Sequence, residues 1–167
     1  MLSSLLVGVF GEHWLGLENI HLITNQDYYT LRVELTDWDK HTVTAEYDVF
    51  MLDDEQHGYR LYVSGYHGDD AGDALSNHSG MKFSTRDVDN DLAVNEFGGS
   101  CAKRFSGAWW YHKCYKSNLN GKYYKLGDVT EGAFDGISWK PWKGPKYSMK
   151  KVEMKIRPRD AGDRMIL

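Results

Sequence analysis

The sequence has 167 residues, a length typical of one domain with a sizeable core. Its formal net charge is −4, with acidic and basic residues interspersed, which excludes the basic footprint of a nucleic-acid-binding protein. No apolar run approaches the roughly 20 residues that span a bilayer, so the sequence predicts no transmembrane segment.

The N-terminal region combines an apolar start with a short helical pattern. Residues 1–10, MLSSLLVGVF, lack the basic beginning and the small-residue cleavage site of a signal peptide. From His13 to Ile23 apolar residues recur at every third or fourth position. This spacing predicts a short helix over His13–Ile23.

Four stretches alternate between apolar and polar residues. They are Tyr29–Thr36, Val43–Met51, Tyr59–Val63 and Lys151–Arg157. The first three predict an antiparallel meander, and the last strand most simply pairs back into the same sheet. From Ser64 onward the chain is polar and punctuated by glycine, which indicates a long functional or disordered loop region. The predicted fold class is α+β.

An acidic ladder follows within that loop region, at Asp87, Asp89 and Asp91. Three carboxylates this close repel one another, and hard oxygen ligands favour Ca²⁺ over zinc or copper. A solvated acidic turn is the alternative. An EF-hand is rejected because Leu92 and Gly98 occupy the positions that need glycine and glutamate.

The only two cysteines, Cys101 and Cys114, flank the aromatic run Trp109–Tyr111. A disulfide, a buried pair of free thiols, and a zinc site with His112 or His78 are all open. The abundant aromatic residues serve either as core or as a rigid binding surface. No G-x-S-x-G, Walker or H-E-x-x-H motif occurs, so we expect no enzyme activity.

Several of these motifs occur in the order found in one family. The segments are FSTRDVDND, Cys101-Ala102, GAWWYHKC, SNLNGKYY, GEHWLGLENIHLIT and YSMKKVEMKIRP. They resemble the fibrinogen-like domain of ficolins, tachylectin-type lectins, tenascin, angiopoietins and the fibrinogen chains. The resemblance covers about nine tenths of the chain. It assigns residues 11–160 to a fibrinogen-like domain, with an atypical N-terminal segment at 1–10 and a C-terminal tail at 161–167.

The resemblance implies a central antiparallel sheet, a short helix and a long, loop-rich subdomain that binds calcium and ligand. It also implies a secreted protein, and a Cys101–Cys114 disulfide is therefore favoured. The sequon Asn77-His78-Ser79 agrees with an exposed loop of a secreted glycoprotein and predicts glycosylation at Asn77.

The calcium ligands implied by the resemblance are two aspartates and two backbone carbonyls. The aspartates correspond to Asp89 and Asp91, and Ala93 is the first carbonyl donor. The second carbonyl is that of Asn95 or Gly99. The loop before the first cysteine is longer here than is usual in the family.

Lectins of this family bind acetylated sugars beside the calcium, next to a cis peptide bond before the second cysteine. That bond corresponds to Lys113–Cys114. The residues that we assign to the ligand pocket are Phe105, Lys113, Cys114, Tyr115, Ala133 and Phe134. Phe134 stands where the peptide-binding hole of fibrinogen carries an aspartate, so we do not expect fibrin-knob recognition.

The first functional hypothesis is a secreted, calcium-dependent lectin that binds acetylated glycans in innate recognition. The alternative is a receptor-binding or extracellular-matrix adhesion module of the same fold without a sugar site. We also expect the protein to be an oligomer that assembles through upstream segments absent from this chain.

Family members carry a longer N-terminal segment before GEHWLGLENIH, including a strand of the central sheet. Residues 1–10 are too short to replace it. We therefore expect a truncated domain in which the Lys151–Arg157 strand has an unpaired edge.

Overall fold

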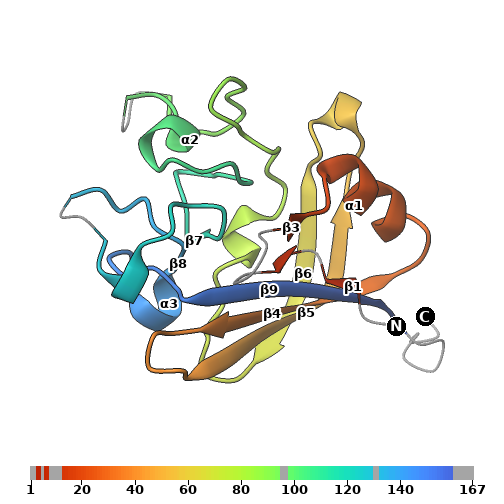
Figure 1. The fold of residues 1–167 in the computed structure, drawn as a ribbon. Coiled ribbons are helices and arrows are strands. Elements are labelled where there is room, and N and C mark those ends of the chain that lie inside the picture. Colours follow the sequence, from red (N-terminus) through yellow and green to blue (C-terminus); the bar gives the residue numbers. More distant parts are fainter. Residues whose placement is uncertain (1–2, 5, 8–12, 95–97, 130–131, 160–167) are drawn as a thin grey trace.

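A computed structural model describes residues 3–4, 6–7, 13–94, 98–129 and 132–159. Its main element is an antiparallel five-stranded sheet in the order β1-β9-β4-β5-β6. The strands are β1 (Ser3–Ser4), β4 (Tyr29–Thr36), β5 (Thr42–Leu52), β6 (Leu61–Gly68) and β9 (Lys151–Pro158). Figure 1 shows the sheet beside a second region with few regular elements, which we name the loop-rich half (residues 69–94, 98–129 and 132–150).

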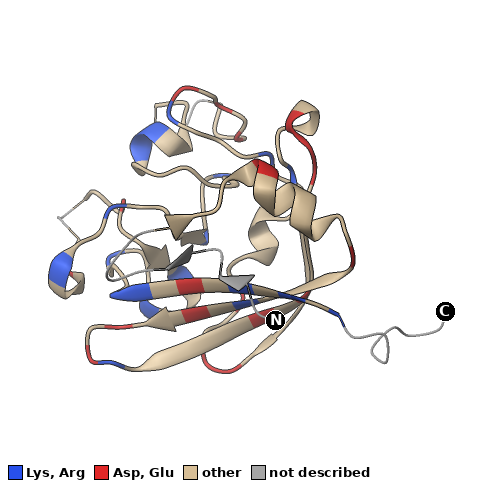
Figure 2. Ribbon diagram, turned by 45° about the vertical axis from the view of Figure 1, so that its right-hand side comes forward, with Lys and Arg blue, Asp and Glu red and all other residues tan. Residues whose placement is uncertain are grey.

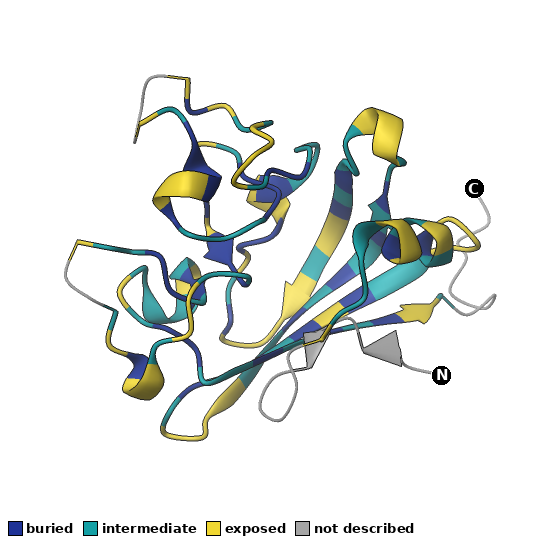
Figure 3. Cartoon of the chain, turned by 45° about the horizontal axis from the view of Figure 1, so that its top comes forward, coloured by how far each residue is buried: buried dark blue, intermediate teal, exposed yellow. Residues whose placement is uncertain are grey.

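One face of the sheet packs into the hydrophobic core. Alternate side chains of β4 and β9 are buried, namely Leu31, Val33, Leu35, Val152, Met154 and Ile156 (Figure 3). Val33 lies opposite Ala45 of β5 on one side and opposite Met154 of β9 on the other. The alternation therefore predicted both the meander and the return of the last strand correctly.

Charged residues of both signs alternate with the buried residues along β4, β5 and β9, and Figure 2 marks them on the ribbon. Lys155 of β9 lies 2.6 Å from Glu34 of β4, and Arg32 of β4 lies 2.7 Å from Glu46 of β5. Ion pairs that remain partly exposed to water contribute little stability, so the apolar face provides most of the energy that holds the sheet.

The helix α1 (Leu17–Thr24) packs against β5 through the buried Ile20. It is shorter than the predicted helix, because His13 and Trp14 form the strand β3, which pairs with β2 (Leu6–Val7). Gly16 precedes the helix with a φ of 90°, a conformation that favours glycine and lies outside the helical region. The apolar spacing was thus correct, but the backbone enters the helix only after Gly16.

The strand β6 continues past Val63, where the predicted strand ends, to Gly68. Ser64, Gly65, His67 and Gly68 are exposed, so no apolar alternation marks this extension. A Cβ atom at Gly65 would lie 2.6 Å from the Asp48 side chain, and its φ is 70°. Backbone pairing with β5, rather than side-chain burial, extends the strand.

The edge of β9 is paired where β1 lies beside it. Ser3 lies opposite Ile156 and Ser4 opposite Lys155. At these positions the expectation of an unpaired edge is wrong, because main-chain pairing needs no particular side-chain pattern. The predicted tail at 161–167 lies outside the described residues.

The loop-rich half contains only short elements. They are η2 (Ser76–His78), α2 (Cys101–Arg104), β7 (Ser117–Asn118), η3 (Lys125–Gly127), β8 (Ser138–Trp139) and α3 (Lys140–Lys143), and η1 (Glu55–His57) lies in the β5–β6 hairpin. Its core is aromatic, with Trp109, Trp110, Tyr111 and Trp139 all fully buried. In the part of the chain that the structure describes, no helix is long and apolar enough to cross a membrane.

His78 joins several segments of the loop-rich half. Its Nδ1 donates to the carbonyl of Trp110 at 2.7 Å, and its Nε2 accepts the backbone N–H groups of Lys116 and Ser117 at 3.2 and 3.1 Å. Burial lowers the pKa of His78 to about 4, so the ring is neutral at physiological pH. The side chain thereby satisfies three backbone groups that a loop otherwise leaves unpaired.

Candidate functional site

The two cysteines form a disulfide. The Cys101–Cys114 bond joins the start of α2 to the segment that leads into β7, with the Cα atoms 5.5 Å apart. This confirms the disulfide, and the free-thiol and zinc interpretations are wrong because neither sulfur is free. The bond joins α2, which follows the acidic loop (residues 85–94), to the chain directly after the aromatic run Trp109–Tyr111.

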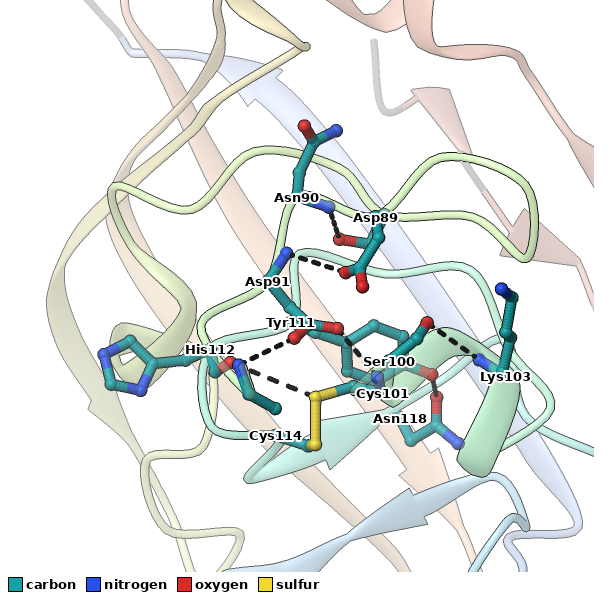
Figure 4. The surroundings of a disulfide bond; sticks show 12 residues. Asp89, Asn90, Asp91, Ser100, Cys101, Lys103, Tyr111, His112, Cys114 and Asn118 are labelled. Atoms are coloured by element: carbon teal, nitrogen blue, oxygen red, sulfur yellow. Dashed lines mark hydrogen bonds between the residues drawn. A yellow bond between two sulfur atoms is a disulfide. The ribbon is translucent and has the colours of Figure 1, made fainter. Parts of the chain in front are cut away.

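Asp91 lies directly beside this disulfide (Figure 4). Its Oδ2 accepts the backbone N–H of Cys101 at 2.7 Å, and its Oδ1 accepts the N–H of Ala93 at 2.8 Å. The Asp89 carboxylate in turn accepts the N–H of Asp91 at 3.3 Å. Asp91 therefore sets the conformation of the acidic loop and its distance from α2.

Asp89 and Asp91 form a close pair of carboxylates. Burial raises the pKa of Asp91 and the charge of Asp89 raises it further, although the N–H groups of Ala93 and Cys101 act in the opposite direction. Two neighbouring carboxylates disfavour each other's ionised form, and a bound cation reverses this effect. The donor set is oxygen only, which fits a hard cation such as Ca²⁺.

Asp87 does not join this pair. Its carboxylate accepts the Thr85 hydroxyl at 2.7 Å, and this hydrogen bond lowers the pKa of Asp87. Of the proposed carbonyl donors, Ala93 is buried, whereas Gly99 is partly exposed with a φ of 81°. Asn95 lies outside the described residues.

Two further groups of acidic and histidine side chains lie near the ends of the sheet strands. They are Asp37, Asp39 and His41, and Asp53, Asp54 and His57. In the first group, Lys143 already neutralises the buried Asp37 at 2.8 Å. In the second, Asp54 caps η1 by accepting the N–H of His57.

Three of the aromatic residues assigned to the ligand pocket come together. The rings of Phe105 and Tyr115 meet edge to face with centroids 4.9 Å apart. The Tyr115 hydroxyl donates to the carbonyl of Phe134 at 2.5 Å. Phe105 and Tyr115 are 6% and 4% exposed, so the more accessible parts of this cluster are Ala133 and Phe134.

The peptide bond between Lys113 and Cys114 is cis. The Lys113 side chain is exposed, whereas Cys114 is buried. The backbone N–H of His112 donates to the Cys114 carbonyl at 2.8 Å. The cis peptide bond and the disulfide therefore share Cys114.

Two cations lie over this ring pair, and the sequence did not suggest either of them. The Arg104 guanidinium lies 5.5 Å from the centroid of Phe105, and the Lys140 ammonium lies 3.9 Å from the centroid of Tyr115. Arg104 also donates to the carbonyls of Gly132 and Ala133. Burial lowers the pKa of Lys140, and the charge of Lys116 adds to this effect.

Asn118 links several segments around the pocket residues through its side chain, and the sequence did not suggest this role either. Its Oδ1 accepts the Tyr111 hydroxyl at 2.6 Å, and its Nδ2 donates to the carbonyls of Phe105 and Gly136. A Cβ at Gly107 would lie 2.7 Å from both Asn118 Oδ1 and the Tyr111 hydroxyl. The SNLNG motif marked Asn118 as part of a pattern, but not as the residue that links these segments.

The predicted glycosylation residue, Asn77, is exposed in η2. The hydroxyl of Ser79, the third residue of the sequon, accepts the backbone N–H of Val63 at 3.1 Å. The middle residue is the buried His78, so the sequon lies on a firmly anchored turn.

Comparisons with known proteins agree with this architecture. The family model for the C-terminal globular domain of fibrinogen beta and gamma chains matches residues 4–159. Fibrinogen C domain-containing protein 1-B of Xenopus laevis is 49% identical over 153 residues, covering 89% of this chain and 32% of that protein. Microfibril-associated glycoprotein 4 of Bos taurus is 47% identical, covering 88% of this chain and 57% of that protein. The chain thus spans between a third and somewhat over half of the length of these relatives.

Solved structures show the same fold. The fibrinogen-like globe domain of human ANGPTL2 has a TM-score of 0.85 and 44% identity, covering 92% of this chain and 68% of that chain. Lamprey fibrin D-dimer, complexed with the peptide ligand Gly-His-Arg-Pro-amide, has a TM-score of 0.82 and 38% identity, covering 95% of this chain and 55% of that chain. These relatives are fibrinogen-like proteins rather than enzymes, which agrees with the expectation of no enzyme activity. The chain therefore belongs to the family of fibrinogen C-terminal globular domains.

Proposed function

We propose that this domain is an extracellular, calcium-dependent recognition module that binds acetylated sugars beside the Cys101–Cys114 disulfide. The observation that carries this proposal is the position of Asp91. Its backbone N–H donates to the Asp89 carboxylate, and its own carboxylate accepts the N–H of Cys101 at 2.7 Å. A cation at the acidic loop is thereby coupled to the backbone of the ligand region.

The residues that would hold Ca²⁺ are Asp89 and Asp91 through their carboxylates, with carbonyl groups from Ala93 and Gly99. The bound ion supplies positive charge that neutralises the carboxylate pair. Asp91 keeps its two backbone hydrogen bonds in this role, since a carboxylate accepts at several positions.

The ligand side consists of the Lys113–Cys114 backbone with Phe105, Tyr115, Ala133 and Phe134. Aromatic rings and an alanine methyl provide apolar contacts for the methyl of an acetyl group. Tyr115 already donates its hydroxyl to the Phe134 carbonyl. Sugar hydroxyls would therefore find few free side-chain partners in this cluster, and we expect weak binding.

A titration monitored by NMR tests this function. We expect N-acetylglucosamine to perturb the resonances of Tyr115 and Phe134 in Ca²⁺ and to lose this effect in EDTA, while glucose has no effect. Phe134→Ala should change the affinity without unfolding the domain, because Phe134 is only partly buried. Perturbation confined to other residues, or binding that survives EDTA unchanged, would contradict the proposal.

Adhesion to a receptor or matrix protein is the second candidate, and one observation favours it. The acidic loop exposes three apolar side chains, with Val88 at 51%, Leu92 at 43% and Val94 at 79% exposure. Exposed apolar residues that gather on a functional loop are typical of protein contacts. A partner that is not displaced by N-acetylglucosamine but is lost in Val94→Asp would support this candidate over the sugar site.

Secretion and glycosylation are part of the same proposal. The disulfide agrees with an oxidising compartment, and Asn77 is exposed on its turn. Expression of the chain behind a signal peptide in eukaryotic cells should give a species that an N-glycosidase shortens, and Asn77→Gln should remove that species. An unmodified secreted protein would contradict glycosylation at Asn77.

A further inference from the structure

One cavity of the domain is lined by residues other than those assigned to acetyl and calcium binding. It has a volume of about 600 Å³ and opens between β3, the segment after Phe83, and the loop that follows α2. Its apolar walls come from Trp14, Phe83, Ala102 and Ala108. None of the residues assigned to acetyl or calcium binding lines it.

The walls form a fixed aromatic surface. The Trp14 ring stacks on Phe83 at 6.0 Å between centroids and with 29° between the planes, and it also contacts Trp110 at 6.4 Å. Phe83 and Ala102 are buried, while Trp14 and Ala108 remain partly exposed to the cavity. An indole face held in this way is a suitable platform for the C–H face of a flat or ring-shaped ligand.

Two cations border the same cavity. Arg86 is exposed, and no carboxylate in the described part of the chain forms an ion pair with it. Lys122 pairs with the buried Asp135 at 2.7 Å, which raises the pKa of Lys122, while the nearby positive charge of Arg86 acts in the opposite direction. Asp135 thus already neutralises Lys122, and Arg86 is the cation at this cavity that is available to an anion.

The remaining polar residues suit hydroxyl groups. Asn120 donates through Nδ2 to the Ala108 carbonyl at 2.9 Å, which holds its side-chain amide at the rim of the cavity. Ser106 lies beside it and interacts with Asp135. Amide and hydroxyl groups that are already oriented lose little entropy when they bind sugar hydroxyls.

We propose that this cavity binds an acidic sugar ring that carries a carboxylate or a sulfate. The ring lies on Trp14, and the anion pairs with Arg86, beside the Lys122–Asp135 ion pair. The guanidinium of Arg86 provides the planar, two-pronged donor that both anions accept. This inference does not rest on the proposed acetyl site, because the two sets of residues differ.

The test is an NMR titration of the whole chain with three sugars that lack an acetyl group. Methyl glucuronide and methyl glucoside 6-sulfate distinguish the two anions, and methyl glucoside is the neutral control. We expect one or both anionic sugars to shift the Trp14 indole and the Gly107 and Ala108 amides. The neutral sugar should bind at least about tenfold more weakly, as the loss of one charged hydrogen bond predicts.

Arg86→Gln is the decisive variant, because Arg86 is exposed and its removal leaves the core intact. We expect it to weaken the anionic sugar about tenfold, whereas Lys103→Gln, an exposed cation outside the cavity, leaves the affinity unchanged. The unperturbed spectrum of the variant reports that it is folded. Equal binding of the neutral sugar, no effect of Arg86→Gln, or shifts confined to Tyr115 and Phe134 would overturn the proposal.

Discussion

The sheet and the loop-rich half are stabilised by different kinds of interaction. In the sheet, β4 pairs with β5 and β9 along its length, and alternate aliphatic side chains fill one face. In the loop-rich half, individual polar side chains such as His78 and Asn118 bond to the backbone of distant segments. The first arrangement distributes stability over many equivalent contacts, whereas the second concentrates it in a few residues.

This difference also explains where function is located. Loops held by single polar groups can bring residues from distant parts of the chain to one place, and they present these residues on the surface. Asp91, Cys101 and Phe105 lie in the loop-rich half, and each bonds to a segment at least several residues away. The sheet provides the rigid support against which the loops are ordered.

The largest expected effect is the removal of a single polar side chain from the loop-rich half. His78→Ala removes three hydrogen bonds to the backbone and leaves a cavity, and we expect a loss of about 4 kcal/mol in the free energy of unfolding. The matched control is His67→Ala on the exposed face of the sheet, where we expect less than about 1 kcal/mol. Urea unfolding of the two variants measures both values. Similar losses at the two positions would show that the contrast between the halves is wrong.

The pH dependence of the free energy of unfolding tests the role of His78 in the loop-rich half. Burial lowers the pKa of His78 to about 4, while a histidine in the unfolded chain titrates near about 6.5. The unfolded chain therefore binds the extra proton in this interval, so stability is complete above about pH 6.5 and falls by about 3 kcal/mol as the pH drops to about 4.

NMR titration of the His78 imidazole in the wild-type protein measures its pKa directly, and unfolding at several pH values measures the stability. A His78 ring that titrates near pH 6.5 in the folded protein would contradict this prediction.

Calcium should stabilise the loop-rich half in particular. At a free Ca²⁺ concentration of about 100 times the Kd, binding to the folded state adds about 2.7 kcal/mol. Asp89→Asn should abolish this gain. Asp87→Asn should retain it, because the Asp87 carboxylate bonds to Thr85 rather than to the carboxylate pair.

Thermal unfolding with Ca²⁺ and with EDTA measures the effect, and hydrogen exchange shows which amides gain protection. We expect the amides of the acidic loop and α2 to gain more than those of the sheet. A gain that persists in Asp89→Asn would place the ion elsewhere.

The smallest expected effect comes from a strained turn. Leu126 has a φ of 65° and is 75% exposed, so it is held in a left-handed conformation without burial to compensate. That conformation costs an L-residue about 1–2 kcal/mol, and glycine avoids this cost. The greater conformational freedom of glycine in the unfolded chain cancels about 0.4–1 kcal/mol of this gain in stability. We expect Leu126→Gly to stabilise the domain by up to about 1 kcal/mol. Lys125→Gly is the control, since Lys125 has no positive φ, and chemical unfolding should show that it destabilises.

The regular parts of the fold could be predicted because their signals are local. Alternation in Tyr29–Thr36 and Lys151–Arg157 reflects which side chains face the core, and the structure pairs these strands directly. The extension of β6 to Gly68 could not be seen, because backbone pairing at an exposed edge needs no apolar pattern. The helix start was placed too early because periodicity does not report the backbone angles of Gly16.

The residues of the candidate site likewise fall into those that the sequence indicated and those that only the structure showed. Short motifs pointed to Asp89, Asp91 and the two cysteines, since their chemistry depends on residue type and near spacing. The cations over the rings, Arg104 and Lys140, left no comparable pattern, because their positions depend on how α2 and α3 pack against Tyr115 and Phe105.

Residue chemistry along the chain was thus sufficient for the sheet and the acidic ladder, whereas the resemblance to the fibrinogen-like family selected Asp89 and Asp91 and favoured the disulfide. The contacts between segments that are distant in the chain could be seen only in the folded structure. Trp14, Arg86 and Lys122 meet around one cavity only because β3, the acidic loop and the segment after β7 come together in the folded domain. Contacts of this kind depend on shape and burial at several positions at once, which no single stretch of sequence encodes.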